Sequence, residues 1–145
     1  MTIDRPSVFL KGNHEEEFFQ FYRKFGSTSA KQQKILNHFG IDAYHVRWLS
    51  MSLVDSYENE SAFFSHAGID DCKPLNLQSS YDLLNSAFKE NLDHVTSKLI
   101  VQGHLPMKDV VSYGNHWFVD TGCSIGGTLS ALVYPEMAIL SSEIK

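Results

Sequence analysis

The sequence of 145 residues predicts a layered α/β domain. Helix-like patterns concentrate in the first two thirds of the chain, and strand-like patterns concentrate in the last third. In addition, short apolar runs are followed by polar loops that carry a histidine and a neighbouring glycine: 8–10 before His14, 62–65 before His66 and 99–102 before His104. Because strand ends in an open α/β sheet face one crevice, these loops are expected to form a site together.

The first expected helix spans residues 15–25, directly after the first loop. Its aromatic side chains recur at helical spacing and form one apolar stripe: Phe18, Phe19, Tyr22 and Phe25. Glutamates fill its first turn, where the helix dipole favours negative charge, and Gly26 is a natural stop.

Further helices are expected from their end signals. One spans 30–39 and closes at Gly40, and the next begins at an Asp42 cap and continues through residue 49. A fourth is expected to open at Ser79, which forms a capping-box pattern with Asp82, and to continue to about residue 92.

Strands are expected where short apolar runs lie between turn signals. The first of these is 8–10, and the next is 62–65, which follows a turn at 58–60. The remaining expected strands are 98–102, 110–112, 116–119 and 128–134, with a hairpin turn at 113–115.

Composition narrows the class of protein. A hydrophobic content of 43% supports a globular fold, and a net charge of −5 argues against nucleic-acid or membrane-surface partners. No apolar stretch has the length of a membrane span, and the start lacks a signal-peptide pattern. Cys72 and Cys123 are far apart and are expected to be reduced thiols, so the protein is expected in the cytoplasm.

Asn13, His14, His66 and His104 are the residues expected to meet at the strand ends. Neutral imidazoles with an amide oxygen suit a first-row divalent metal, and a histidine titrates in the range needed for acid catalysis. Structural alternatives stay open: Asn13 as a turn residue, His14 as a polar residue at a helix start, and the other two as buried structural histidines.

In their order along the chain, Gly12-Asn13-His14-Glu15, His66-Ala67-Gly68 and Gly103-His104 resemble the last signature blocks of the calcineurin-like metallophosphoesterases. The closest branch is that of the bacterial serine/threonine phosphoprotein phosphatases and diadenosine tetraphosphatases. The segment 118–123 also follows the usual ending of this branch. The resemblance implies an α/β/β/α sandwich in which metals bind at one edge of the sheets.

The resemblance also implies roles for these residues. Asn13, His66 and His104 would bind the second of two metals, and His14 would be the general acid that protonates the leaving group. Manganese is the expected metal, with iron, zinc and nickel as alternatives. The metals would activate a water that attacks phosphorus. Substrates would be phosphorylated proteins or small phosphoesters such as dinucleoside polyphosphates.

The chain also departs from the family pattern. The two earlier blocks, an Asp-x-His-Gly turn and a Gly-Asp-x-x-Asp-Arg-Gly turn, are not found. We therefore expect 1–145 to be one partial domain, lacking the amino-terminal portion, with at most one well-formed metal site. An uncovered edge at 8–10 would favour self-association. An inactive remnant that serves as a binding module is the alternative.

Other positions near the blocks are less specific. The family's phosphate-binding arginine is matched by Ala87, which Lys89 or Lys98 could partly replace. Asp120 could hold the other ring nitrogen of a ligand histidine or form an Asx turn. The histidines outside the blocks are expected to be surface or structural residues: His38, His45, His94 and His116.

Overall fold

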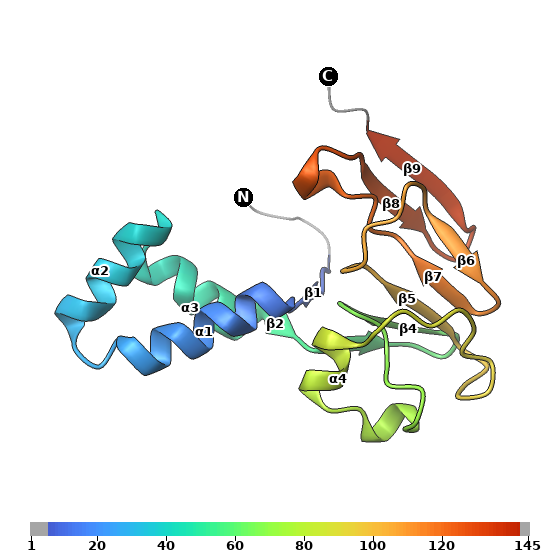
Figure 1. Cartoon of the computed structure of the whole chain (residues 1–145), viewed down its shortest axis with the longest axis horizontal. Coiled ribbons are helices and arrows are strands. Elements are labelled where there is room, and N and C mark those ends of the chain that lie inside the picture. The colour runs from blue at the N-terminus through green and yellow to red at the C-terminus, as the bar shows by residue number, and fades with distance from the viewer. Residues whose placement is uncertain (1–5, 143–145) are drawn as a thin grey trace. The chain divides into compact units, whose positions relative to one another are not determined.

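The computed structural model describes residues 6–142, and Figure 1 shows its elements. The chain divides between Val54 and Asp55 into two compact units, each with internal packing of its own. The expectation of one domain over 1–145 stays a prediction.

The first unit is helical, with one short parallel strand pair. Its elements are β1 (Phe9–Leu10), α1 (Asn13–Phe25), α2 (Ser29–Phe39), α3 (Ala43–Ser52) and β2 (Leu53–Val54). The predicted ends are present at Gly40, which is left-handed, and at Asp42, whose Oδ1 accepts from the amide of His45. At the start of α2, Thr28 Oγ1 accepts from the amide of Lys31. β1 pairs with β2, so one of its edges is hydrogen-bonded, and self-association stays a prediction.

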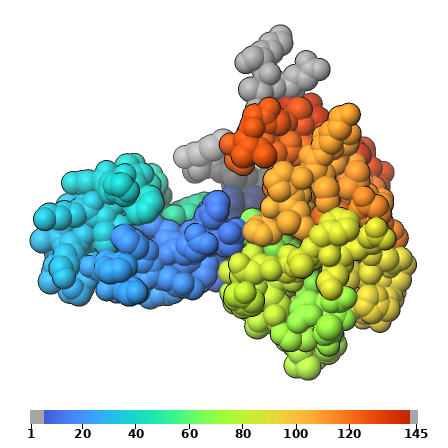
Figure 2. Space-filling view, in the orientation of Figure 1, coloured from blue at the N-terminus to red at the C-terminus, as the bar shows by residue number. Residues whose placement is uncertain are grey.

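The aromatic stripe of α1 packs partly against α2. Phe18 meets Phe39 edge to face, with ring centroids 5.3 Å apart, and stacks on Tyr22 of its own helix. Phe25 and Phe39 nevertheless stay 48% and 49% exposed on these helices, which are blue to cyan in Figure 2. Packing within this unit therefore buries only part of the aromatic stripe.

The second unit contains a mixed sheet with the order β3-β4-β5-β7-β6. Its strands are β3 (Ser56–Glu58), β4 (Ala62–Ser65), β5 (Leu99–Gln102), β6 (Val111–Tyr113) and β7 (His116–Phe118). The three central strands are parallel, and the two outer strands are antiparallel to their neighbours. β4, β5 and β7 end at one edge of the sheet, and this edge carries two of the predicted loops.

The described part of the chain finishes with a hairpin of β8 (Leu129–Val133) and β9 (Ala138–Ser142). Thr121 joins the hairpin to the sheet, because its hydroxyl donates to the carbonyl oxygen of Thr128 at 2.7 Å. All residues of β9 are exposed, and its sequence Ala138-Ile139-Leu140-Ser141-Ser142 lacks the apolar–polar alternation that would have predicted the strand.

A buried apolar cluster lies against the sheet, formed by Phe63, Ile69, Leu83, Leu92 and Ile100. Leu83 comes from α4 (Ser80–Asn85), whose capping box at Ser79 is present as predicted. Its predicted end near residue 92 is wrong. Ser86 is extended, and its hydroxyl donates to the carbonyl oxygen of Asp82. Beyond it, Phe88 stacks on Phe118 and Leu92 is fully buried, so tertiary packing ends the helix early.

The cysteines and the described helices can be compared with the sequence expectations. Cys72 and Cys123 are both free and exposed, which agrees with the expected thiols. None of the described helices has the length and apolar character needed to cross a membrane.

Asn115 holds the loop that leads into β5. Its side-chain amide donates to the carbonyl oxygens of Thr96 and Lys98, and its Oδ1 accepts from the amide of Leu92 at 3.1 Å. We predict that Asn115→Leu lowers the free energy of unfolding by about 2–3 kcal/mol, because buried backbone groups lose their partners. Urea denaturation measures this change. The exposed Asn76→Leu is the control, expected within about 0.5 kcal/mol of wild type; equal effects of the two variants would contradict the assignment.

Candidate functional site

The structure brings together two of the predicted site residues, His66 and His104. His66 directly follows β4, His104 follows β5 after Gly103, and the parallel pairing of Ser65 with Gln102 ends both strands at the same level. His66 Nε2 lies 3.0 Å from His104 Nδ1, and the ring centroids are 4.8 Å apart. Both side chains are half-buried, so the pair is open to solvent. Whether they ligate a metal stays a prediction.

The backbone around this histidine pair is tightly turned. Gly103 donates its amide to the carbonyl oxygen of His66 at 3.0 Å, which ties the two loops together. Leu105 donates its amide to the carbonyl oxygen of Gly103 at 2.7 Å, and His104 between them has φ +67°. A hydrogen bond from i+2 to i around a positive central φ defines the rare, strained form of γ-turn. The left-handed region costs a residue other than glycine roughly 1–2 kcal/mol.

A buried polar layer lies behind these loops. Gln102 and His116 are each 1% exposed, and Gln102 Oε1 lies 2.7 Å from His116 Nε2. The other ring nitrogen of His116 lies 2.9 Å from the carbonyl oxygen of Lys89. The expectation that His116 is structural agrees with this burial. Gln102 was not among the predicted site residues, although a glutamine inside the apolar run of β5 was the available signal.

Burial controls the charge of His116. Removal from water lowers the pKa of His116 from 6.5 to about 4, and its hydrogen bond with Lys89 opposes this shift only in part. The ring is therefore neutral near pH 7. A neutral imidazole carries one hydrogen, so it can donate to only one of the two carbonyl oxygens at a time.

Asn13 and His14 lie in the other unit, in the first turn of α1. Gly12 precedes them as the N-cap, with its amide donating to Glu15 Oε2 at 2.8 Å. His14 is exposed. The convergence of these two residues with His66 and His104 stays a prediction.

Asp120 occupies the turn that follows β7. Its Oδ1 accepts from the amide of Gly122 at 2.9 Å, which is the Asx-turn alternative. A Cβ placed on Gly103 would lie 3.8 Å from Asp120 Cβ, so Asp120 is next to the loop that carries His104. Its support of a ligand histidine stays a prediction.

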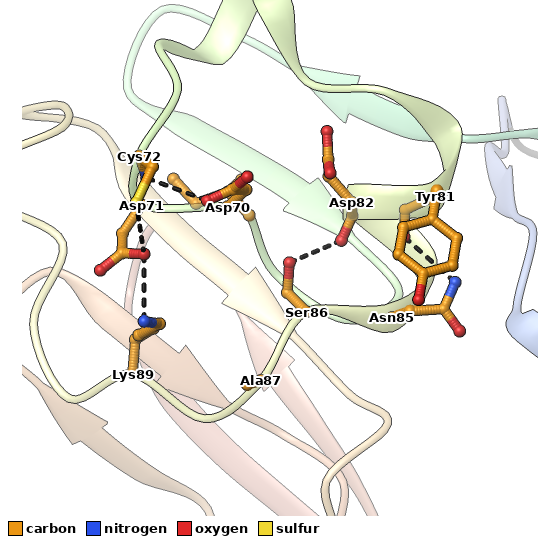
Figure 3. A pocket seen from close by; sticks show the side chains of 10 residues that line it. Asp70, Asp71, Cys72, Tyr81, Asp82, Asn85, Ser86, Ala87 and Lys89 are labelled. Carbon is orange, nitrogen blue, oxygen red and sulfur yellow. Dashed lines mark hydrogen bonds and ion pairs between the residues drawn. The ribbon is translucent and has the colours of Figure 1, made fainter.

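A hollow of about 280 Å³ lies between the loop after His66 and the end of α4 (Figure 3). Asp70, Asp71 and Cys72 line it, and each offers a ligand atom within 4.8 Å of the others. Asp71 pairs with Lys89 at 3.1 Å, and Asp70 pairs with Lys73 at 3.3 Å. The negative charge of this cluster is therefore only partly balanced, because Lys73 lies closer to Asp82, at 2.7 Å.

Ion pairs also involve the lysines that could replace the family's phosphate-binding arginine. Ala87 lines the hollow and offers no charge. Lys89 is paired with Asp71, and Lys98 is paired with Glu58 at 2.7 Å. Each lysine considered as a replacement for the family's arginine thus already holds a carboxylate.

Comparison with known proteins supports the predicted resemblance. No protein-family model matches the chain. The bis(5'-nucleosyl)-tetraphosphatase PrpE [asymmetrical] of Anoxybacillus flavithermus is 51% identical over 43 residues, which cover 30% of this chain and 18% of the relative. The enzyme of the same name from Geobacillus thermodenitrificans is 48% identical over 42 residues, which cover 29% of this chain and 17% of the relative. The matches thus span less than a fifth of either relative.

A solved crystal structure adds evidence on the fold. It is of a protein provisionally assigned as a diadenosine tetraphosphatase, with a TM-score of 0.70 and 19% identity. The match covers 94% of this chain and 68% of that chain. These findings confirm the predicted layered α/β fold and the resemblance to the diadenosine tetraphosphatase branch.

The pKa of His116 predicts how stability depends on pH. Since the folded protein holds the pKa near 4 and the unfolded chain near 6.5, the unfolded state binds more protons between these values. The contribution of neutral, buried His116 to the free energy of unfolding is complete above pH 6.5 and is lost as the pH falls towards 4. Its slope is up to about 1.4 kcal/mol per pH unit.

Urea denaturation at pH 7, 6 and 5 measures this loss. His116→Phe, which cannot titrate, should lose less stability than wild type over the same range. Parallel pH profiles for the two proteins would show that the pKa of His116 is not shifted in the folded state.

Proposed function

We propose that this protein is a metal-dependent phosphoesterase that hydrolyses dinucleoside polyphosphates. The observation that carries the proposal is the 3.0 Å separation of His66 Nε2 and His104 Nδ1 at the ends of adjacent parallel strands. The names of the relatives, which are tetraphosphatases, favour this substrate over a phosphorylated protein.

The donor set suits a divalent cation. Two nitrogens bound at about 2.1 Å, with roughly a right angle between them, would be about 3.0 Å apart. Imidazole nitrogen is a ligand for manganese, iron, nickel and zinc, with manganese as our first choice. Such a cation, when bound, supplies a Lewis acid and a water of lowered pKa.

The residues of this chain would divide the remaining tasks. His66 and His104 would hold the cation, and the amide oxygen of Asn13 would be a third ligand. His14 would donate a proton to the leaving nucleotide oxygen, so that the bond to phosphorus breaks without releasing an unprotonated product. Because these three ligands are neutral, they do not balance the charge of the cation, and binding by them alone is expected to be weak.

A non-catalytic binding module is the second candidate. It is favoured by the charge pairing described above, because Ala87 supplies no cation and Lys89 is paired with Asp71. Without a guanidinium fork, a substrate phosphate would lose much of its electrostatic clamp. The module would bind a phosphorylated ligand or a protein without turning it over.

Hydrolysis of diadenosine tetraphosphate with Mn²⁺ tests the proposed function, with nucleotide products separated by chromatography. We expect manganese-dependent turnover that falls about 10²- to 10⁴-fold in His14→Ala, because the leaving group loses its acid. His66→Gln should raise the manganese concentration needed for activity.

His38→Ala is the matched control, since His38 is exposed on α2 and should leave turnover unchanged. If the protein hydrolysed phosphoserine peptides but not diadenosine tetraphosphate, the dinucleoside substrate would be excluded. Binding of the nucleotide without any hydrolysis would favour the binding module.

A further inference from the structure

The side chain of Gln102 hydrogen-bonds the carbonyl oxygen of Gly103, the residue that precedes His104. Its Nε2 donates to that oxygen at 3.1 Å. The same oxygen accepts the amide of Leu105 and so closes the γ-turn around His104. Because the carbonyl belongs to the peptide that joins Gly103 to His104, its orientation determines the direction in which the His104 side chain leaves the backbone.

Both peptide groups of Gly103 are therefore restrained. On the amino side, its amide donates to the carbonyl oxygen of His66. On the carboxyl side, its carbonyl is held by Gln102. A strained turn persists only when its surroundings over-determine it, and these two contacts do so on either side of one residue.

Gln102 is itself held in place by its neighbours. His116 Nε2 lies 2.7 Å from its Oε1, which leaves the amide nitrogen facing the Gly103 carbonyl. On the other side lies Gly68, with φ +81°, where a Cβ would come within 2.1 Å of the same oxygen. Only a glycine at this position leaves room for the glutamine. The carboxamide thus lies between the loops that carry His66 and His104.

We infer that Gln102 is a positioning residue that maintains the γ-turn at His104 and thereby directs its ring towards His66. The inference rests on the proposed function only where it treats these histidines as cation ligands. Residues behind metal ligands typically affect affinity about 10- to 100-fold. Gln102 would do so through the backbone, not through a ligand's ring nitrogen.

The first test needs no metal. Imidazole ¹⁵N and ¹H spectra of the full chain should show a hydrogen shared between His66 Nε2 and His104 Nδ1. We expect Gln102→Leu to remove this signature while the backbone amide spectrum stays folded. Gln102→Met, which keeps the length of the side chain without its hydrogen bonds, should do the same and serves if the leucine variant does not fold.

Asn115→Leu is the matched control. It also replaces a buried, hydrogen-bonded amide, but one that holds Thr96 and Lys98, away from the histidine loops. It should lower stability and keep the shared-hydrogen signature. Persistence of the signature in folded Gln102→Met, its loss in both Gln102→Met and Asn115→Leu, or its absence from wild type would overturn the inference.

A Mn²⁺ titration of the same proteins separates this inference from the proposed function. We expect affinity to fall about 10- to 100-fold in Gln102→Met and to stay unchanged in Asn115→Leu. If wild type shows the signature and Gln102→Met loses it, but neither binds Mn²⁺, the proposed function fails and the positioning role of Gln102 stands.

Discussion

The parallel pairing of β4 with β5 is the constraint on which the candidate site depends. Its register places Ser65 opposite Gln102, so the next residues along both strands leave the sheet at the same level. A shift of one residue would turn the side chains of one strand to the opposite face. The pairing is secured by burial, since Phe63 and Ile100 belong to one apolar cluster and face each other in the register. The meeting of His66 and His104 is therefore a consequence of core packing.

Next to this strand pair, buried polar groups orient the backbone through directional hydrogen bonds, which apolar packing does not provide. Gln102 and His116 are almost fully buried, yet each makes directional contacts that determine backbone orientation. Buried polar groups of this kind are costly unless they are satisfied, and no described buried side-chain nitrogen or oxygen lacks a partner. The unfavourable φ of His104 is thus sustained by a layer whose members support one another.

The parts of the structure that were predictable from the sequence are those with local signals. The caps at Gly40 and Asp42 and the apolar run of β4 agree with their predictions because each depends on neighbouring residues. The helix predicted to reach residue 92 failed because its last residues pack against β7, which lies far along the chain. Within the candidate site, ordered motifs pointed to His66 and His104. The role of Gln102 depends on strand register, which a single sequence does not reveal.

In the proposed function, His66 and His104 bind one divalent cation together. Pulsed electron paramagnetic resonance of the Mn²⁺-loaded protein tests it directly, because the method detects ¹⁴N nuclei bound to manganese. We expect couplings from two imidazoles, one of which disappears in His66→Gln and the other in His104→Gln. A wild-type spectrum without imidazole nitrogen, or one that neither substitution changes, would show that the two histidines do not bind the cation together.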